Sequence, residues 1–217
     1  MPKEARPGSG EQAKQYALER LRKAILHGDM APAQRLVENE LAESYGVTRA
    51  SMRAALLDLT SEGLVERIRN RGSRVRVVTV EEAVEITECR MALEGLCAGK
   101  AATEATDAQL DELTDLGEAM SKAVTNGDPV AYSELNHDLH ALIRDASGQH
   151  TAVGLLERLN AQLVRHRFRL ALRPGRPQQS LSEHLAVIEA IRARDTQAAE
   201  TAVRAHLSSV IDALRAD

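Results

Sequence analysis

The sequence predicts a mainly helical protein in which an N-terminal winged helix-turn-helix precedes an all-helical antiparallel bundle of six or seven helices. Only 2% of the 217 residues are aromatic and none is Trp. Cores must therefore be built from Leu, Ile, Val and Ala, a composition that favours packed helices over a β-sandwich. Apolar residues recur at helical spacing through most of the chain, whereas residues 64–77 have the pattern of a hairpin.

The length and charge distribution indicate two domains. A chain of 217 residues can bury two cores. We expect a disordered Pro/Gly-rich terminus over 1–11, a first domain over 12–78 and a helical domain over 79–217. The net charge of −4 divides into +4 for residues 1–79 and −8 for the remainder. The first domain is therefore the candidate nucleic-acid face.

Apolar runs are short, and the first residues lack the apolar segment of a signal peptide. We therefore expect a cytoplasmic protein with no membrane partner. Cys89 and Cys97 fall on one predicted helix. Their separation of roughly 12 Å excludes a disulfide between them.

The first predicted helix covers 12–27 and ends at Gly28. Two short helices follow within Glu40–Leu64. In the first, Leu41, Ala42 and Tyr45 form an inward stripe, and Gly46 supplies the left-handed residue that ends it. Thr48 can cap the second helix, whose predicted apolar face comprises Met52, Ala55, Leu56 and Leu59.

The start of the second helix predicts a DNA-reading surface. Its expected exposed residues are Thr48, Arg49, Ser51 and Arg53. A helix-turn-helix reads DNA with the N-terminal residues of its second helix, where hydroxyls and arginines contact phosphates and guanine edges. The alternative interpretation is a helical hairpin with a solvated, charged end.

A predicted hairpin follows, with strands at 64–68 and 73–77 and a tip at Asn70-Arg71-Gly72. It carries arginines at positions 67, 69, 71, 74 and 76. The Arg-Gly tip can approach a phosphate backbone or enter a minor groove without a Cβ clash. Alone, such a charge run is usually a solvated face, but beside a recognition helix it favours DNA binding.

These segments carry a resemblance to a known family. Residues 21–77, which include ELAESYGVTR and EGLVERIRNRGSRV, resemble the winged helix of the GntR family of bacterial transcription regulators. Ala33 stands where the family usually has Gly, and Ala50-Ser51-Met52 replaces a Thr/Pro-containing stretch. The resemblance implies a homodimer that binds double-stranded operator DNA. It implies DNA contacts by Arg35, Thr48, Arg49, Ser51, Arg53, Arg71 and Gly72.

From residue 80 onward the chain is predicted to be helical. The expected helices cover about 80–102, 107–125, 129–146, 150–172, 179–194 and 196–214. On the first, we expect buried side chains at Val84, Ile86, Met91, Leu93 and Leu96. This arrangement resembles the FCD effector domain of the FadR-type subfamily of GntR regulators, which implies an effector-binding and dimerisation domain.

Three histidines and an amide are expected to point into this bundle. Asn136 and His140 lie one turn apart, and His184 and His206 fall on two other inward stripes. One inward His is usually a satisfied core residue, but three leave several ring nitrogens to be paired. Imidazoles with one oxygen donor suit Zn²⁺, Ni²⁺ or Mn²⁺. Glu183 is expected to face away, and His27, His137, His150 and His166 are expected on the surface.

The family resemblance implies the same metal ligands. Metal-binding FadR-type domains have Asp or Asn, His four residues later, and two further histidines, which correspond to Asn136, His140, His184 and His206, with Zn²⁺ the metal most expected. Asn in place of Asp leaves the ion's charge uncompensated, so we expect weaker metal binding and stronger attraction for an anionic effector.

Candidate effector ligands are arginines. Arg90 resembles an arginine that the family keeps near its ligand cavity, and could pair bidentately with an effector carboxylate. The alternative for Arg90 is an internal salt bridge with Glu94. Arg144, Arg165 and Arg169 are weaker candidates.

The sequence thus predicts a ligand-responsive, sequence-specific DNA-binding transcription regulator. We expect a repressor whose helical domain binds a metal ion and a small organic acid. One alternative is a metal-free regulator that senses an acyl chain or another small ligand. A second is a metal-dependent hydrolase fused to a DNA-binding domain, against which the absence of a His-Glu-x-x-His motif argues.

Overall fold

The computed structural model describes residues 10–69 and 71–216, apart from the side chains of residues 165 and 168. The chain divides into two compact units, Met1–Val78 and Thr79–Asp217. The predicted terminal disorder falls mainly on residues 1–9, outside the described residues, as does Asn70 of the predicted hairpin tip.

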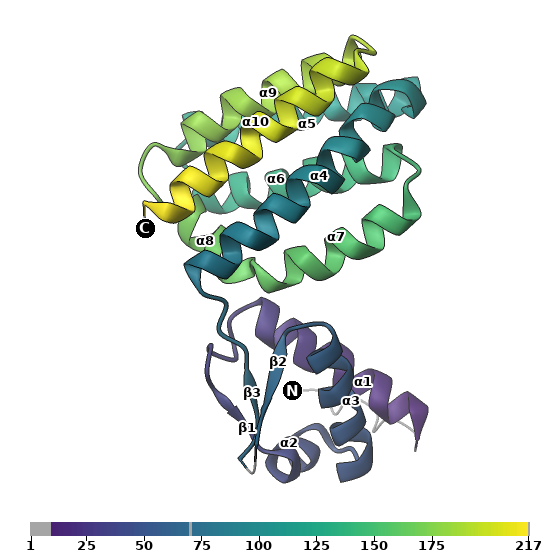
Figure 1. Cartoon of the computed structure of the whole chain (residues 1–217), viewed down its shortest axis with the longest axis vertical. Helices are drawn as coiled ribbons and strands as arrows, with labels where there is room; N and C mark the ends of the chain where they lie inside the picture. The colour runs from purple at the N-terminus through teal and green to yellow at the C-terminus, as the bar shows by residue number, and fades with distance from the viewer. Residues whose placement is uncertain (1–9, 70, 217) are drawn as a thin grey trace. The chain divides into compact units, whose positions relative to one another are not determined.

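Within its described residues, the first unit combines three helices with a small sheet (Figure 1). The helices are α1 (Glu11–Leu26), α2 (Glu38–Tyr45) and α3 (Arg49–Ser61). The strands are β1 (Arg35–Leu36), β2 (Val65–Ile68) and β3 (Gly72–Val75), which form an antiparallel sheet of order β1-β3-β2. The predicted hairpin pairs Val65 with Val75 and Ile68 with Gly72. Strand β1 was not foreseen from the sequence.

The turn between α2 and α3 follows from two residues. Gly46 adopts a left-handed conformation with φ 65°, and the Thr48 hydroxyl accepts a hydrogen bond from the Ser51 amide at 3.1 Å. The predicted apolar face of α3 is buried, comprising Met52, Ala55, Leu56 and Leu59. This face packs against α1, so the opposite side and the start of α3 remain available to a partner.

Ser51 does not belong to that exposed start. Its side chain is buried, and its hydroxyl contacts the Thr48 hydroxyl at 3.0 Å and the Gly10 carbonyl oxygen at 3.4 Å. The prediction of an exposed Ser51 was wrong because Gly10, which immediately precedes α1, contacts this side chain.

The second unit contains seven helices within its described residues (Figure 1). They are α4 (Val80–Glu104), α5 (Asp107–Thr125), α6 (Pro129–Ala146), α7 (His150–Gln162), α8 (Val164–Ala171), α9 (Arg176–Arg192) and α10 (Thr196–Arg215). Their common core contains Leu113, Leu139, Ile191 and Leu207, all fully buried. Within the described ranges, no helix combines the length and hydropathy needed to cross a bilayer.

Helix α4 packs closely against α10 through small residues. A Cβ atom at Gly99 would lie 2.8 Å from the Glu200 side chain, and one at Gly95 would lie 3.2 Å from Arg204 Nε. The burial predicted for Leu96 was wrong, since this side chain is 41% exposed. The buried side of α4 is instead formed by smaller neighbours such as Gly95, Cys97 and Ala98.

Two helix boundaries differ from prediction and affect the site. The expected helix over 150–172 is interrupted at Leu163, whose amide bonds the Asn160 carbonyl in a tighter turn. Helix α9 begins at Arg176, after Gly175 with φ 80°, so it includes residues assigned to a loop. Arg167 on α8 and Arg176 on α9 consequently reach the bundle interior.

Ala33 provides a stability test of this fold, because its φ is 65°. A left-handed non-glycine residue costs about 1–2 kcal/mol, whereas glycine adds unfolded-state entropy worth about 0.4–1 kcal/mol. We expect Ala33→Gly to raise the free energy of unfolding by about 0.5–1 kcal/mol, measured by denaturant titration. The control Ala31→Gly, at a residue without positive φ, should lower it. Equal destabilisation by both variants would contradict the assignment of strain to Ala33.

Candidate metal centre

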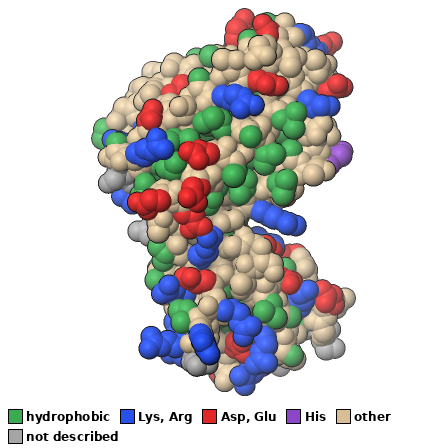
Figure 2. Space-filling view, viewed as in Figure 1, with side chains coloured by type: hydrophobic (Ala, Val, Ile, Leu, Met, Phe, Trp, Pro, Cys, Tyr) green, Lys and Arg blue, Asp and Glu red, His purple; other side chains and the backbone are tan. Residues whose placement is uncertain are grey.

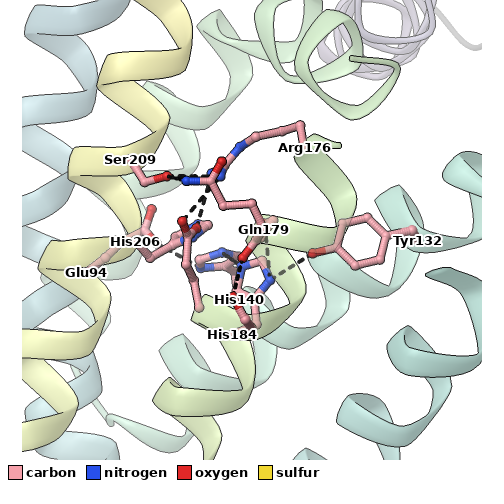
Figure 3. Close-up of polar contacts among 11 residues, drawn as sticks. Glu94, Tyr132, His140, Arg176, Gln179, His184, His206 and Ser209 are labelled. Atoms are coloured by element: carbon pink, nitrogen blue, oxygen red, sulfur yellow. Dashed lines mark hydrogen bonds and ion pairs between the residues drawn. The ribbon is translucent and has the colours of Figure 1, made fainter. Parts of the chain in front are cut away.

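Three imidazoles meet inside the second unit, one each from α6, α9 and α10. They belong to His140, His184 and His206, and one ligand nitrogen of each lies within 4.8 Å of those of the others. His140 Nε2 and His184 Nε2 are 3.3 Å apart. Figure 3 shows the rings facing one another between the helices. The predicted convergence of the three stripes is therefore present.

The other ring nitrogen of each histidine has its own partner. His206 Nδ1 forms a hydrogen bond of 2.7 Å with Glu183 Oε2, whereas His140 Nδ1 lies at an ion-pair distance of 2.9 Å from Glu94 Oε2 without hydrogen-bond geometry. His184 Nδ1 lies 3.1 Å from the Tyr132 hydroxyl (Figure 3). It also lies 3.4 Å from the Ser180 hydroxyl. Such contacts fix ring orientation. The carboxylates beside His140 and His206 can only accept a proton from Nδ1 and so favour the tautomer in which Nε2 carries the free lone pair, whereas the hydroxyls beside His184 can donate or accept.

Burial keeps two of these histidines neutral. It lowers the pKa of His206 to about 4 and that of His184 well below its usual range. Neutral imidazole is the form that binds a metal. The supporting carboxylates stay ionised: burial alone would raise the pKa of Glu94, but Arg90 and His140 hold it well below its usual range.

Asn136 offers a fourth donor. Its side-chain oxygen is buried without a hydrogen-bond partner within the described part of the chain, and the residue lines the same cavity as His140 and His206. An unpaired buried carbonyl is costly unless something occupies it. Two imidazole nitrogens bound to one tetrahedral Zn²⁺ are about 3.3–3.4 Å apart, which matches the separation between His140 and His184. The donor set therefore fits a divalent ion.

Glu183 corrects one prediction. It does not face away but contacts His206 and also lies 3.3 Å from the Arg176 guanidinium. Burial would raise its pKa, but hydrogen bonds that include those from His206 and Arg176 lower it to about 2. Adjacent residues on α9 can serve one site because His184 and Glu183 face different partners around it.

The prediction that His166 lies on the surface was also wrong, because its side chain is buried. Helix α8 packs against α6, α9 and α10, which encloses this side. The other three histidines predicted at the surface, His27, His137 and His150, are exposed.

A cavity of about 80 Å³ adjoins the histidines and is rich in arginine. Arg90 and Arg144 line it, as expected of effector ligands, and both are buried. Arg90 also makes the alternative salt bridge, 2.8 Å from Glu94. The side chain of Arg165 lies outside those described, and Arg169 is exposed. Arg167 and Arg176 line the cavity but were not foreseen, because their positions depend on the helix boundaries described above.

The candidate DNA-contacting residues of the first unit are exposed, with the exception of Ser51. Arg49 and Arg53 share one carboxylate: Arg53 Nη2 lies 2.9 Å and Arg49 Nε 3.3 Å from Glu38 Oε2. Arg35 lies on β1, and Arg71 precedes Gly72, whose φ is 86°. Figure 2 shows Lys and Arg side chains crowding the visible surface of this unit.

Comparison with known proteins matches both units to described families. Residues 13–75 match the family described as bacterial regulatory proteins, gntR family, and residues 85–209 match the FCD domain. The HTH-type transcriptional regulator YdhC of Bacillus subtilis is 30% identical over 87% of this chain and 84% of its own. The HTH-type transcriptional repressor RspR of Escherichia coli is 27% identical over 90% of this chain and 86% of its own.

The fold is also found among solved structures. That of E. coli McbR/YncC superposes with a TM-score of 0.77 and 22% identity, covering 94% of this chain and 97% of that one. The matched families and the two named relatives are transcription regulators. The interpretation as a hydrolase is therefore set aside.

The carboxylate behind His206 gives a direct test of the centre. Loss of such an outer partner typically lowers metal affinity by about 10–100-fold. We expect Glu183→Gln to weaken Zn²⁺ binding by that factor and His140→Ala to abolish tight binding, measured by competition with a chelating dye. Glu189→Gln, on an exposed residue of the same helix, should leave it unchanged. Equal affinities for all four proteins would refute the assignment.

Proposed function

Because this chain belongs to the GntR family of bacterial regulatory proteins and carries an FCD domain, we propose that it is a cytoplasmic, homodimeric repressor controlled by a metal-bound organic acid. The observation that supports this most strongly is the cluster of three imidazoles, two buried and one half-buried, each with its Nδ1 beside another polar group. Packing alone does not explain why the Nε2 atoms of three rings inside the bundle point toward one another, because withdrawing unpaired polar atoms from water costs free energy.

The metal proposal names Zn²⁺, with Ni²⁺ or Mn²⁺ as alternatives, held by His140, His184, His206 and Asn136. When bound, the ion would supply a Lewis-acidic charge for an effector carboxylate. Since the four protein ligands carry no charge, that charge is not neutralised by them. Glu94 and Glu183 orient the rings from behind, while Arg90 and Arg144 provide donors for the effector.

The alternative of a long acyl ligand without metal is less well supported. The cavity of about 80 Å³ has room for roughly five to eight water molecules when one needs about 10–15 Å³. Its lining combines apolar residues, among them Leu170, Pro177 and Val210, with Arg, His, Asn and Ser side chains that include four arginines. A short polar acid matches this lining better than a hydrocarbon chain does.

We assign operator binding to exposed residues at the start of α3, on strand β1 and at the tip of the β2–β3 hairpin, which is the wing of this unit. We propose that Thr48, Arg49 and Arg53 contact the major groove or its phosphates, and that Arg35, Arg71 and Gly72 contact the flanking backbone. A two-fold dimer would read two half-sites. Thermodynamic linkage then requires that operator and effector change each other's affinity by the same factor.

A selection from random duplexes tests this DNA-binding surface. We expect the protein to enrich sequences with two-fold-related half-sites. On the enriched duplex, Arg49→Ala should lose about 1–3 kcal/mol of binding free energy, the typical value of one good base contact. Arg192→Ala, which removes an exposed arginine of α9, should bind like the unmodified protein. Equal losses for the two variants in a fluorescence titration would contradict the assignment.

A further inference from the structure

The cavity beside the three histidines carries more positive charge than its carboxylates balance. Four arginines line it: Arg90, Arg144, Arg167 and Arg176. The carboxylates paired with them are Glu94, which contacts Arg90 and His140, and Glu183, which contacts Arg176 and His206. Each of these carboxylates already serves one arginine and one imidazole. The charge of Glu94 also acts on Arg144 and Arg167, but neither carboxylate forms an ion pair with them.

Arg144 and Arg167 have no hydrogen bond or ion pair from their guanidinium groups within the described part of the chain. Arg144 is only 9% exposed. Burial, followed by the neighbouring charges of Arg90 and Arg144, lowers the pKa of Arg167 to about 10, so the group still carries its charge at neutral pH. Arg144 is buried and Arg167 half-buried. A guanidinium withdrawn from water without a direct ion pair is costly, and arginines are suited to bidentate binding of carboxylate or phosphate.

These two arginines and the imidazoles adjoin the same space. The cavity is lined by His140 and His206 as well as by Arg144, Arg167 and the amide of Asn160. Arg144 is one turn beyond His140 on α6, and Arg167 comes from α8. One small ligand can therefore contact both groups of residues at once.

We propose that the effector carries two anionic groups and that Arg144 and Arg167, with Asn160, form the subsite for the second. This inference rests on the proposed function only in assigning the first anionic group to the histidine end of the cavity. The subsite selects short dicarboxylates, or acids with one carboxylate and one phosphate-like group, over monocarboxylates of equal chain length.

Calorimetric titration of the Zn²⁺-loaded full chain tests the proposal. The probes are malonate, succinate and glutarate, each paired with propionate, butyrate or pentanoate, while 3-phosphonopropionate distinguishes a phosphate-like from a carboxylate group. We expect one or more of the dianions to bind at least about tenfold more tightly than its monoanionic counterpart, as an added charge-assisted bidentate contact implies. No preference for any dianion would overturn the proposal.

Variants locate the preference. Arg167→Gln should remove it while leaving monocarboxylate affinity unchanged. Arg144→Gln should also remove it, and unchanged circular dichroism of both variants would exclude unfolding. Arg169→Gln, on an exposed residue of α8, should retain it. A preference that survives both cavity substitutions would place the second anion elsewhere and refute the subsite.

The same titrations on chelator-treated protein separate this inference from the metal proposal. If Zn²⁺ does not bind, the metal proposal fails, yet Arg167→Gln should still weaken dianion binding relative to Arg169→Gln. If Zn²⁺ binds but monoanions and dianions bind equally, the metal proposal stands and the second subsite is wrong.

Discussion

The second unit depends on one constraint, the orientation of two buried imidazoles and one half-buried imidazole by three different partners. Glu94, the Tyr132 hydroxyl and Glu183 hold the Nδ1 atoms of His140, His184 and His206. Because these groups come from α4, α6, α9 and α10, the helices must keep their mutual packing for the rings to converge. The close approach of α4 and α10 at Gly95 and Gly99 brings Glu94 into reach of the cluster. The geometry of the three candidate ligands therefore depends directly on how these helices pack.

The same network explains the charge of the cavity. Two carboxylates are needed behind the rings, and each also holds an arginine, Arg90 or Arg176. The remaining guanidiniums and the neutral Asn136 leave a positive interior that an anion can neutralise. Such a buried polar network is costly when only partly satisfied, and this is why an anionic effector and a metal ion are expected to stabilise the folded unit when they bind.

Much of the fold could be predicted from the sequence because helical periodicity, Gly46 and the Thr48 cap act locally. The metal-ligand candidates were also visible, since His140, His184 and His206 each lie on an apolar stripe. The orientation of Glu183 was not, because a residue beside a stripe faces whichever helix lies there, and α10 supplies His206. The inward positions of Arg167 and Arg176 could not be predicted, because the turn at Leu163 and the start of α9 after Gly175 depend on tertiary packing. Ser51 is buried by a distant segment, which periodicity within α3 cannot reveal.

The most direct test of the central claim is metal-edge anomalous diffraction from crystals of the full chain grown with one equivalent of Zn²⁺. We expect one anomalous peak in the bundle, about 2.0–2.1 Å from the Nε2 atoms of the three histidines and about 2.0–2.2 Å from Asn136 Oδ1. The contacts to Glu94, Tyr132 and Glu183 should persist. An ion coordinated by Nδ1 atoms instead of Nε2 atoms would contradict the proposed metal centre. The absence of any anomalous peak in the bundle would also contradict it.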